Sequence, residues 1–316
     1  MLLAGETTIE LPPFEVVGPT DAPAIAVLGG ISANRHICSN GADSRPGWWE
    51  AMAGRGKAID PSRYQLIGFD FLDGGRGPDG RPERVVSTHD QADALAAVLD
   101  SLGIERLHAI VGSSYGGMVA LAFAERYPHR LDRLVVIGAA HEPHPMSTAL
   151  RAIQRRVVEL GIETGRTHDA LTLARSLAMT TYRSAREFAE RFDSAPSERA
   201  DNDAVFPVER YLKHHGERFA STWRAERFLA LSLSGDLHRI APAAIRTPAV
   251  FVAPEGDAIV PREQIAALAA GVSGPSLLVD LPSLNGHDAF LTEPEALGAI
   301  LEAALTAPAP FAGSLS

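Results

Sequence analysis

Three polar residues, Ser114, Asp257 and His287, have the types and the chain order of a serine nucleophile, its acid and its base. Ser114 lies in the pattern Gly112-x-Ser114-x-Gly116, between an apolar run and a segment with helical periodicity. This pattern is typical of a nucleophile elbow, a sharp strand-to-helix turn that exposes the serine hydroxyl. Five residues alone are a weak signal, but the position between a predicted strand and a predicted helix makes it specific.

The acid and the base each follow a predicted strand. One apolar run is followed by Glu255 and Asp257, and Asp257 is the preferred acid because Glu255 precedes a glycine turn. His287 follows the last apolar run. Since carboxyl ends of parallel strands meet at one sheet edge, the three side chains are expected to converge there. His287 would then take the proton of Ser114, which would attack an acyl carbonyl and form an acyl-enzyme.

An oxyanion formed in this reaction needs backbone N–H donors. The first helical residue after the nucleophile, Tyr115, offers one at a helix N-terminus, where the positive end of the dipole lies. The loop Gly29-Gly30-Ile31-Ser32 follows an earlier apolar run, and Ile31 is the best candidate for the second donor.

Other reactive residue types give weaker signals. His141 and His144 could pair as metal ligands, but no third ligand accompanies them, so we predict no metal site. Cys38 is the single cysteine, which excludes an intramolecular disulfide and a zinc site built on paired cysteines.

The elements that must position these residues alternate along the chain. Segments with helical periodicity separate short, nearly continuous apolar runs, which suit strands buried on both faces. This alternation predicts a doubly wound, mostly parallel α/β sheet. The predicted apolar strands are 22–29, 64–71, 107–112, 134–139, 249–253 and 276–281.

The alternation stops after Ala140 and resumes at Thr247, and the residues between are mostly helical in pattern. We therefore predict an α/β core formed by residues 1–143 and 243–316, with a helical lid, 144–242, inserted between two strands.

Composition sets the broad class. The 316 residues are 46% hydrophobic and 22% charged, as in globular proteins, and the net charge of −10 argues against nucleic acid or an anionic membrane as partner. No apolar stretch is long enough to span a bilayer, and the N-terminal residues have no basic start, so a cytoplasmic protein is expected.

The lid carries more basic than acidic residues, which favours an anionic ligand beneath it. The small, proline-rich tail 307–316 is expected to fray.

Several longer blocks resemble the homoserine O-acyltransferase family of the α/β-hydrolase superfamily. The matching blocks are GWWEAMAGRGKAIDPSRYQLIGFD (47–70), GSSYGGMVALAFAERYP (112–128), TTYRSAREFAERF (180–192), VERYLKHHGERF (208–219) and GHDAFL (286–291). The chain departs from the family pattern at Tyr115, where methionine is usual, and in the loop 29–35, which lacks the family's HALTG sequence.

The resemblance implies an α/β-hydrolase fold with a lid and transfer of an acyl group from acyl-CoA to L-homoserine, in methionine biosynthesis. The transfer would be of the ping-pong type through acyl-Ser114, with acyl-CoA as co-substrate and no further cofactor. Arg183, in the YRS block, is the candidate for the acceptor carboxylate, and Asp288 for its ammonium group. Serine remains open as the acceptor. Family members also suggest a homodimer through the lid.

The acyl donor is predicted from Arg151. Succinyl-using relatives have a segment similar to AIRSLQREAI, with arginine at this place, whereas acetyl-using relatives have an uncharged residue. A guanidinium here could bind the second carboxylate of a succinyl group, which an acetyl group lacks. Succinyl-CoA is therefore slightly favoured over acetyl-CoA. The main alternative is a lidded serine esterase or thioesterase with the same triad, and a non-catalytic binding protein of this fold is a third.

Overall fold

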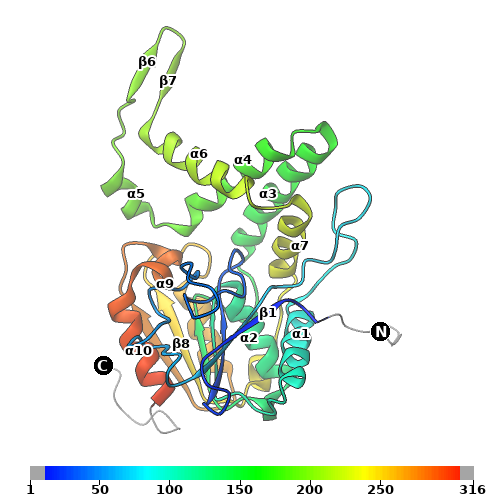
Figure 1. Cartoon of the computed structure of the whole chain (residues 1–316). Helices are drawn as coiled ribbons and strands as arrows, with labels where there is room; N and C mark the ends of the chain where they lie inside the picture. Colours follow the sequence, from blue (N-terminus) through cyan, green and yellow to red (C-terminus); the bar gives the residue numbers. More distant parts are fainter. Residues whose placement is uncertain (1–10, 307–316) are drawn as a thin grey trace.

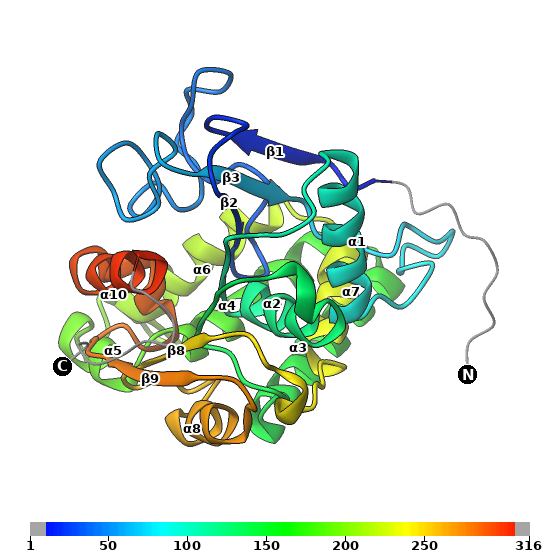
Figure 2. The ribbon, with the colours of Figure 1, turned by 90° about the horizontal axis from the view of Figure 1, so that it is seen from below.

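The computed structural model describes residues 11–306, and the tail predicted to fray lies outside them, as do the first ten residues. Its centre is a seven-stranded sheet with the order β1-β3-β2-β4-β5-β8-β9, parallel except for β1, which runs antiparallel to β3 (Figures 1 and 2). The strands are β1 (Phe14–Val17), β2 (Ala24–Leu28), β3 (Gln65–Phe69), β4 (Ala109–Ser113), β5 (Leu134–Ile137), β8 (Ala249–Pro254) and β9 (Ser276–Leu281).

The continuous apolar runs are explained by burial of both sheet faces. In β2, Ala26 and Leu28 pack on one side with two of the helices, whereas Ile25 and Val27 pack on the other side with the C-terminal helix. Because successive side chains of a strand point to opposite faces, a strand covered on both sides must be apolar at every position.

Two layers of helices provide this cover. The helices α1 (Thr88–Ser101), α2 (Tyr115–Arg126) and α8 (Arg262–Gly271) pack on one face, and α10 (Pro294–Thr306) packs on the other, together with the chain around Trp49. Figure 2, which views the sheet from below, shows α10 on the side opposite α1 and α2. Short helices complete the core: η1 (Pro128–Arg130), η2 (Pro242–Ala244), η3 (Gly286–Asp288) and α9 (Ala289–Thr292).

The chain between β5 and β8 forms a separate helical layer above the carboxyl ends of the strands (Figure 1). Its elements are α3 (Pro145–Thr164), α4 (Thr167–Tyr182), α5 (Ala185–Arg191), β6 (Glu198–Ala200), β7 (Asp203–Val205), α6 (Pro207–Ala220) and α7 (Ala225–Asp236). This layer has its own apolar cluster, centred on Val158, Leu171 and Phe228. We call this layer the lid.

The lid leaves and re-enters the core at one place. The amide of Ile240 donates to the carbonyl of His141 at 3.0 Å. Between them the buried His238 donates from Nε2 to the carbonyl of Ala140 at 3.1 Å and accepts from the hydroxyl of Thr88 at Nδ1, 2.8 Å away. The base of the lid is thus closed by hydrogen bonds, and we call this closure the neck.

The predicted fold class, a doubly wound and mostly parallel α/β-hydrolase sheet, is confirmed. Two details differ from the sequence analysis. The antiparallel strand β1 was not predicted, because its four residues are only half-buried and lack the apolar continuity of the central strands. The hairpin formed by β6 and β7 was also not predicted, since its short strands are largely exposed and carry charged residues.

Candidate active site

Ser114 occupies a strained turn between β4 and α2. Its backbone, with φ 53° and ψ −121°, is the only one with positive φ among the non-glycine residues of 11–306. The neighbouring glycines permit this turn: a Cβ on Gly112 would lie 2.4 Å from the carbonyl oxygen of Gly116, and one on Gly116 would lie 2.3 Å from that of Leu28. Strain of this kind is tolerated where the surrounding structure fixes the backbone and function requires it.

The structure brings the three predicted catalytic side chains together. Nε2 of His287 lies 2.7 Å from Oγ of Ser114, and Nδ1 of His287 lies 2.7 Å from Oδ2 of Asp257. The other carboxylate oxygen of Asp257 accepts from the amides of Ile259 at 2.8 Å and Val260 at 2.9 Å. This chain of hydrogen bonds holds His287 in the tautomer that can accept a proton from Ser114.

The two candidate acids, Asp257 and Glu255, lie in different environments. Asp257 is buried and bonded to His287, whereas Glu255 is exposed and, within residues 11–306, forms no hydrogen bond with the histidine. The turn at Gly256, whose φ is +70°, separates the two carboxyl groups. Gly138, at the end of β5, lies beneath the pair, because a Cβ there would approach His287 Cε1 at 3.4 Å and Asp257 Oδ2 at 3.5 Å.

Burial and charge act in opposite directions on the base. Burial lowers the pKa of His287, but the charge and hydrogen bond of Asp257, together with the charge of Asp288, outweigh burial and raise this pKa above 6.5. Arg151 opposes the rise. An imidazolium formed during the reaction is therefore stabilised mainly by Asp257.

The two residues predicted to supply the oxyanion donors, Tyr115 and Ile31, belong to segments next to the nucleophile. Tyr115 is the first residue of α2, so its amide has no acceptor inside the helix. The loop containing Ile31 passes beside the nucleophile, since a Cβ on Gly30 would lie 3.9 Å from Cβ of Ser114. Neither amide donates a backbone hydrogen bond elsewhere in residues 11–306.

The side chain of Tyr115 joins the core to the lid. Its buried hydroxyl lies 2.7 Å from Oγ of Ser234, on α7, and accepts from Nε2 of Gln91, on α1, at 3.2 Å. Burial raises the pKa of Tyr115 to about 12, so the phenol stays protonated and can donate to the serine. The departure from methionine at this position therefore comes with two polar partners.

The sequence of the whole chain is similar to those of known proteins. Residues 23–294 match the α/β hydrolase fold family. A homoserine O-succinyltransferase of Xanthomonas campestris pv. campestris is 45% identical over 302 residues, which are 96% of this chain and 80% of that protein. The chain belongs to the homoserine O-acyltransferase family. A serine O-succinyltransferase of Litchfieldella anticariensis is 33% identical, over 86% of this chain and 85% of that protein.

Solved structures of lower identity share the fold of this acyltransferase-family chain. A homoserine O-acetyltransferase from Bacillus anthracis superposes with a TM-score of 0.84 at 19% identity and covers 93% of this chain and 91% of its own. The esterase E22 superposes with a TM-score of 0.81 at 22% identity, over 92% of this chain and 93% of its own. The family resemblance predicted from short sequence blocks is confirmed.

In this acyltransferase-family chain, Arg183 and Asp288 lie against each other. Nε of Arg183 is 3.1 Å from Oδ2 of Asp288, and Nη1 donates to Oδ1 of Asn285 at 2.7 Å. Both residues were predicted to bind the acceptor, but their pairing was not predicted. Burial raises the pKa of Asp288 above its usual range. The charge of Arg183 lowers this pKa but does not cancel the effect of burial.

Arg151, predicted to bind the second carboxylate of a succinyl group, already has a carboxylate partner within the protein. Nε of Arg151 donates to Oδ1 of Asp236 at 2.6 Å, and Nη1 of Arg155 donates to Oδ2 at 2.5 Å. The three side chains are 18%, 6% and 16% exposed for Arg151, Asp236 and Arg155. Two cations share one carboxylate, so this cluster keeps one net positive charge near His287.

Sequence reasoning missed two aromatic residues at the site. Tyr182, at the end of α4, stacks at 6.1 Å on the ring of His287, and Phe290 contacts the same ring edge-on at 6.1 Å. Tyr182 belongs to the matched YRS block, so the block itself was a signal. His144, considered as a metal ligand, instead accepts from the amide of Met146 and caps α3.

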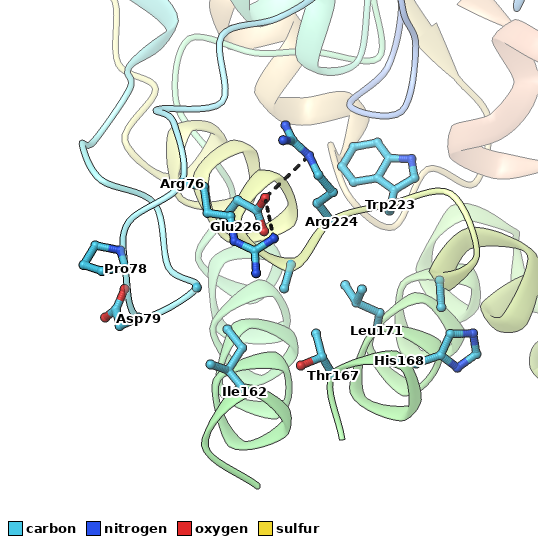
Figure 3. A pocket seen from close by; sticks show the side chains of 13 residues that line it. Arg76, Pro78, Asp79, Ile162, Thr167, His168, Leu171, Trp223, Arg224 and Glu226 are labelled. Carbon is cyan, nitrogen blue, oxygen red and sulfur yellow. Dashed lines mark ion pairs between the residues drawn. The ribbon is translucent and has the colours of Figure 1, made fainter. Parts of the chain in front are cut away.

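A cavity of about 500 Å³ lies away from the triad, between the α3–α4 corner, the loop at Arg76 and the start of α7 (Figure 3). Its buried Glu226 lies 3.5 Å from Nε of Arg224 and 4.0 Å from Nη1 of Arg76. The pair with Arg76 links the lid to the β3–α1 connection. Among residues 11–306, no helix combines the length and apolarity needed to cross a membrane.

Proposed function

We propose that this protein transfers a succinyl group from succinyl-CoA to the side-chain hydroxyl of L-homoserine, by a ping-pong reaction through succinyl-Ser114, in methionine biosynthesis. The observation that carries the proposal is the Ser114–His287–Asp257 hydrogen-bond chain beneath a lid that carries arginines at the site. The names of the two relatives described above support succinyl transfer to an amino acid.

In the first half-reaction, His287 takes the proton of Ser114 as Oγ attacks the thioester carbonyl. The amides of Tyr115 and Ile31 stabilise the oxyanion. Collapse of the tetrahedral intermediate breaks the carbon–sulfur bond, the CoA thiolate takes the proton from His287, and succinyl-Ser114 remains. In the second half-reaction His287 takes the proton of the acceptor hydroxyl, which attacks the ester, and then returns a proton to Ser114.

The acceptor is an amino acid in this proposal because Arg183 and Asp288 lie next to the base. An amino acid is a zwitterion, and its two charges are complementary to this ion pair. Its ammonium group would bind Asp288, and its carboxylate would bind Arg183. Homoserine is preferred over serine because the relative with the higher identity is a homoserine O-succinyltransferase.

The donor is succinyl-CoA in this proposal because the Arg151–Asp236–Arg155 cluster has one uncompensated positive charge. Burying the distal carboxylate of a succinyl group without a cation would cost several kcal/mol. The cluster supplies that cation at a position where its charge already acts on His287.

The test is a matrix of two donors and two acceptors. Purified protein is mixed with succinyl-CoA or acetyl-CoA, alone or with L-homoserine or L-serine, and free thiol is measured. We expect continuous thiol release, beyond the one equivalent freed by acylation of Ser114, only with an amino-acid acceptor, and fastest for succinyl-CoA with homoserine. Parallel mass spectrometry without acceptor should show the mass of one succinyl group on the protein.

Hydrolysis is the competing activity, and the E22 esterase shows that this fold also occurs in an esterase. An esterase would release thiol or hydrolyse aryl esters at the same rate with and without amino acid. That outcome would overturn the transferase proposal while keeping the triad. The predicted cytoplasmic location stays a prediction.

We also propose that two chains pair through the lid. Met146, Ile153 and Leu160 lie seven residues apart on α3, hence on one face, and are 60%, 54% and 45% exposed. An exposed apolar stripe of this kind suits a second copy. Light scattering of the full chain should give the mass of a dimer, and Ile153→Lys should shift it to that of a monomer.

A further inference from the structure

The side chain of Tyr115 is fixed in the protein, and the proposed reaction uses only its backbone amide. The residue is 3% exposed, and its ring lies edge-on against Phe71, with 4.9 Å between centroids. Its hydroxyl accepts from Gln91, whose side-chain amide is itself held by the backbone amide and carbonyl of Leu72, both at 2.9 Å. A close-packed phenol with these contacts is a rigid point of attachment, because it cannot turn away without losing them.

The element attached at this point is α7. Oγ of Ser234 lies 2.7 Å from the hydroxyl oxygen of Tyr115, and Ser234 is fully buried. Gly235 packs against the same ring, since a Cβ on it would lie 3.9 Å from Cδ2 of Tyr115. The residue that follows the nucleophile therefore holds the last turn of a lid helix.

The other side of this turn holds two arginines of α3. Asp236 accepts from Arg151 and Arg155 with its two carboxylate oxygens, and Oγ of Ser232 accepts from Arg155 at 3.0 Å. Ser232 and Asp236 are four residues apart and share one face of α7. Ser234 is two residues from each of them and lies about 200° around the helix from both. One turn of α7 thus contacts the phenol on one side and the arginines on the other.

This arrangement ties the position of the arginines to the nucleophile. The side chain of Asp236 is 6% exposed and packed within the helix layer, so a shift or rotation of α7 that broke the bond to Tyr115 would also move Asp236 and the arginines bonded to it. The backbone amide of Tyr115 is one of the proposed oxyanion donors. The distance from the reacting carbonyl to Arg151 is therefore set through one residue.

We propose that Tyr115 and Ser234 are positioning residues for the acyl donor. Their hydrogen bond fixes α7 so that Asp236 holds Arg151 within reach of the distal carboxylate of a succinyl group. The other end of the same acyl group, its carbonyl oxygen, meets the amide of Tyr115. This assignment rests on the proposed function, because it requires succinyl-CoA as the donor. The two hydroxyls thereby affect the choice of donor without contacting it.

The experiment compares the two donors in Ser234→Ala, which removes one hydroxyl and keeps a residue that favours the helix. Thiol release is measured over a range of succinyl-CoA or acetyl-CoA concentrations with saturating L-homoserine. We expect KM for succinyl-CoA to rise about fivefold, within the range for one lost neutral hydrogen bond, and kcat to change less than about twofold. KM for acetyl-CoA should change less than about twofold, because an acetyl group has no distal carboxylate.

Tyr115→Phe removes the other hydroxyl of the same bond and should lower the preference for succinyl-CoA over acetyl-CoA by the same factor. The variant with both substitutions should show no further loss of preference, because the two changes remove one interaction. The matched control is Tyr127→Phe. The hydroxyl of Tyr127 donates to Asp93, on α1, at 2.6 Å, and its loss should leave the donor preference unchanged.

Equal losses with both donors in Ser234→Ala would overturn the proposal and indicate a general structural role. An unchanged donor preference, or losses that add in the double variant, would also overturn it. If Ser234→Ala does not fold, Tyr115→Phe decides between the same outcomes. Failure of the proposed function is seen in the wild-type protein, which would then prefer acetyl-CoA or hydrolyse both donors, and the inference would fail with it. A failure of the inference alone leaves the wild-type preference for succinyl-CoA in place.

Discussion

The triad and the lid arginines differ in how completely the protein satisfies them. Ser114, His287 and Asp257 form a continuous chain of hydrogen bonds at the ends of sheet strands. The distance from donor to acceptor is 2.7 Å in both bonds. Above them, Arg151 shares one carboxylate with a neighbour. Within residues 11–306, Arg175 forms no ion pair and contacts the rings of Tyr182 and Phe219 instead. The core is thus preorganised for the proton transfer. The lid has positive charge that, in the proposed reaction, would pair with the carboxylates of the succinyl group and the acceptor.

This difference separates two functions of the molecule. The sheet determines which bond can be attacked, because the nucleophile and base are fixed by strand ends. In the proposed reaction the lid selects the donor and the acceptor, because its arginines lie close to the catalytic base. Changes in the core should therefore affect every substrate alike, and changes in the lid should discriminate among substrates.

The largest expected effect is that of Ser114→Ala. This substitution removes the nucleophile, so acylation by succinyl-CoA should disappear, and mass spectrometry should show no added mass. Ser113→Ala is the matched control, since Ser113 is buried in β4 and its hydroxyl makes no hydrogen bond within the described chain. Equal labelling of the Ser114 variant and wild type would disprove the assignment.

The next effect concerns the acid. Asp257→Asn should lower kcat by on the order of 10³–10⁴, because His287 would lose the partner that fixes its tautomer and stabilises its charged form. The fold should survive, since an amide oxygen can still accept from Ile259 and Val260. Glu255→Gln, one residue past the end of the same strand, should have little effect. A larger loss in the Glu255 variant would mean that the acid is misassigned.

A smaller and selective effect is expected in the lid. Arg151→Ala should lower kcat/KM for succinyl-CoA about tenfold, the value of one lost charge-assisted contact, and leave acetyl-CoA unchanged or improved. Arg156→Ala, an exposed arginine of the same helix, serves as control. Equal loss with both donors, or a wild-type preference for acetyl-CoA, would contradict the succinyl assignment.

The smallest effect is a shift in pH dependence. Because the pKa of His287 is raised above 6.5, kcat/KM for acylation should fall as the pH drops through that pKa, where the base becomes protonated. Asp288→Asn removes one of the charges that raise it, so the acidic limb should move to lower pH. Asp169→Asn, on the lid surface, should leave the limb unchanged, and a shift in the opposite direction would refute the electrostatic account.

The sequence predicted the triad because each member follows a local signal. Ser114 lies in a short glycine pattern, and Asp257 and His287 each follow a buried apolar run, so strand order alone brings them to one edge. The family, the fold class and the presence of helices between two strands were predictable for similar reasons: all depend on patterns that extend over neighbouring residues.

Long-range pairing could not be predicted in this way. Asp236 is 85 residues from Arg151, and Asn285 is 102 residues from Arg183, so no periodicity connects them. Arg175 was missed because its partners are aromatic rings, and one of them, Phe219, lies on a different helix. Such contacts depend on how the lid helices pack, which composition and spacing leave open.

The neck has a consequence for how such enzymes diversify. Because His141 and Ile240 are joined directly, the sheet receives the inserted segment at a single closed point. The entropic cost of closing a loop grows only with the logarithm of its length. Lengthening, trimming or replacing the insertion therefore changes the stability of the core little. The catalytic triad can therefore stay unchanged while the lid varies. In this fold, a change of substrate range does not require a change of the core.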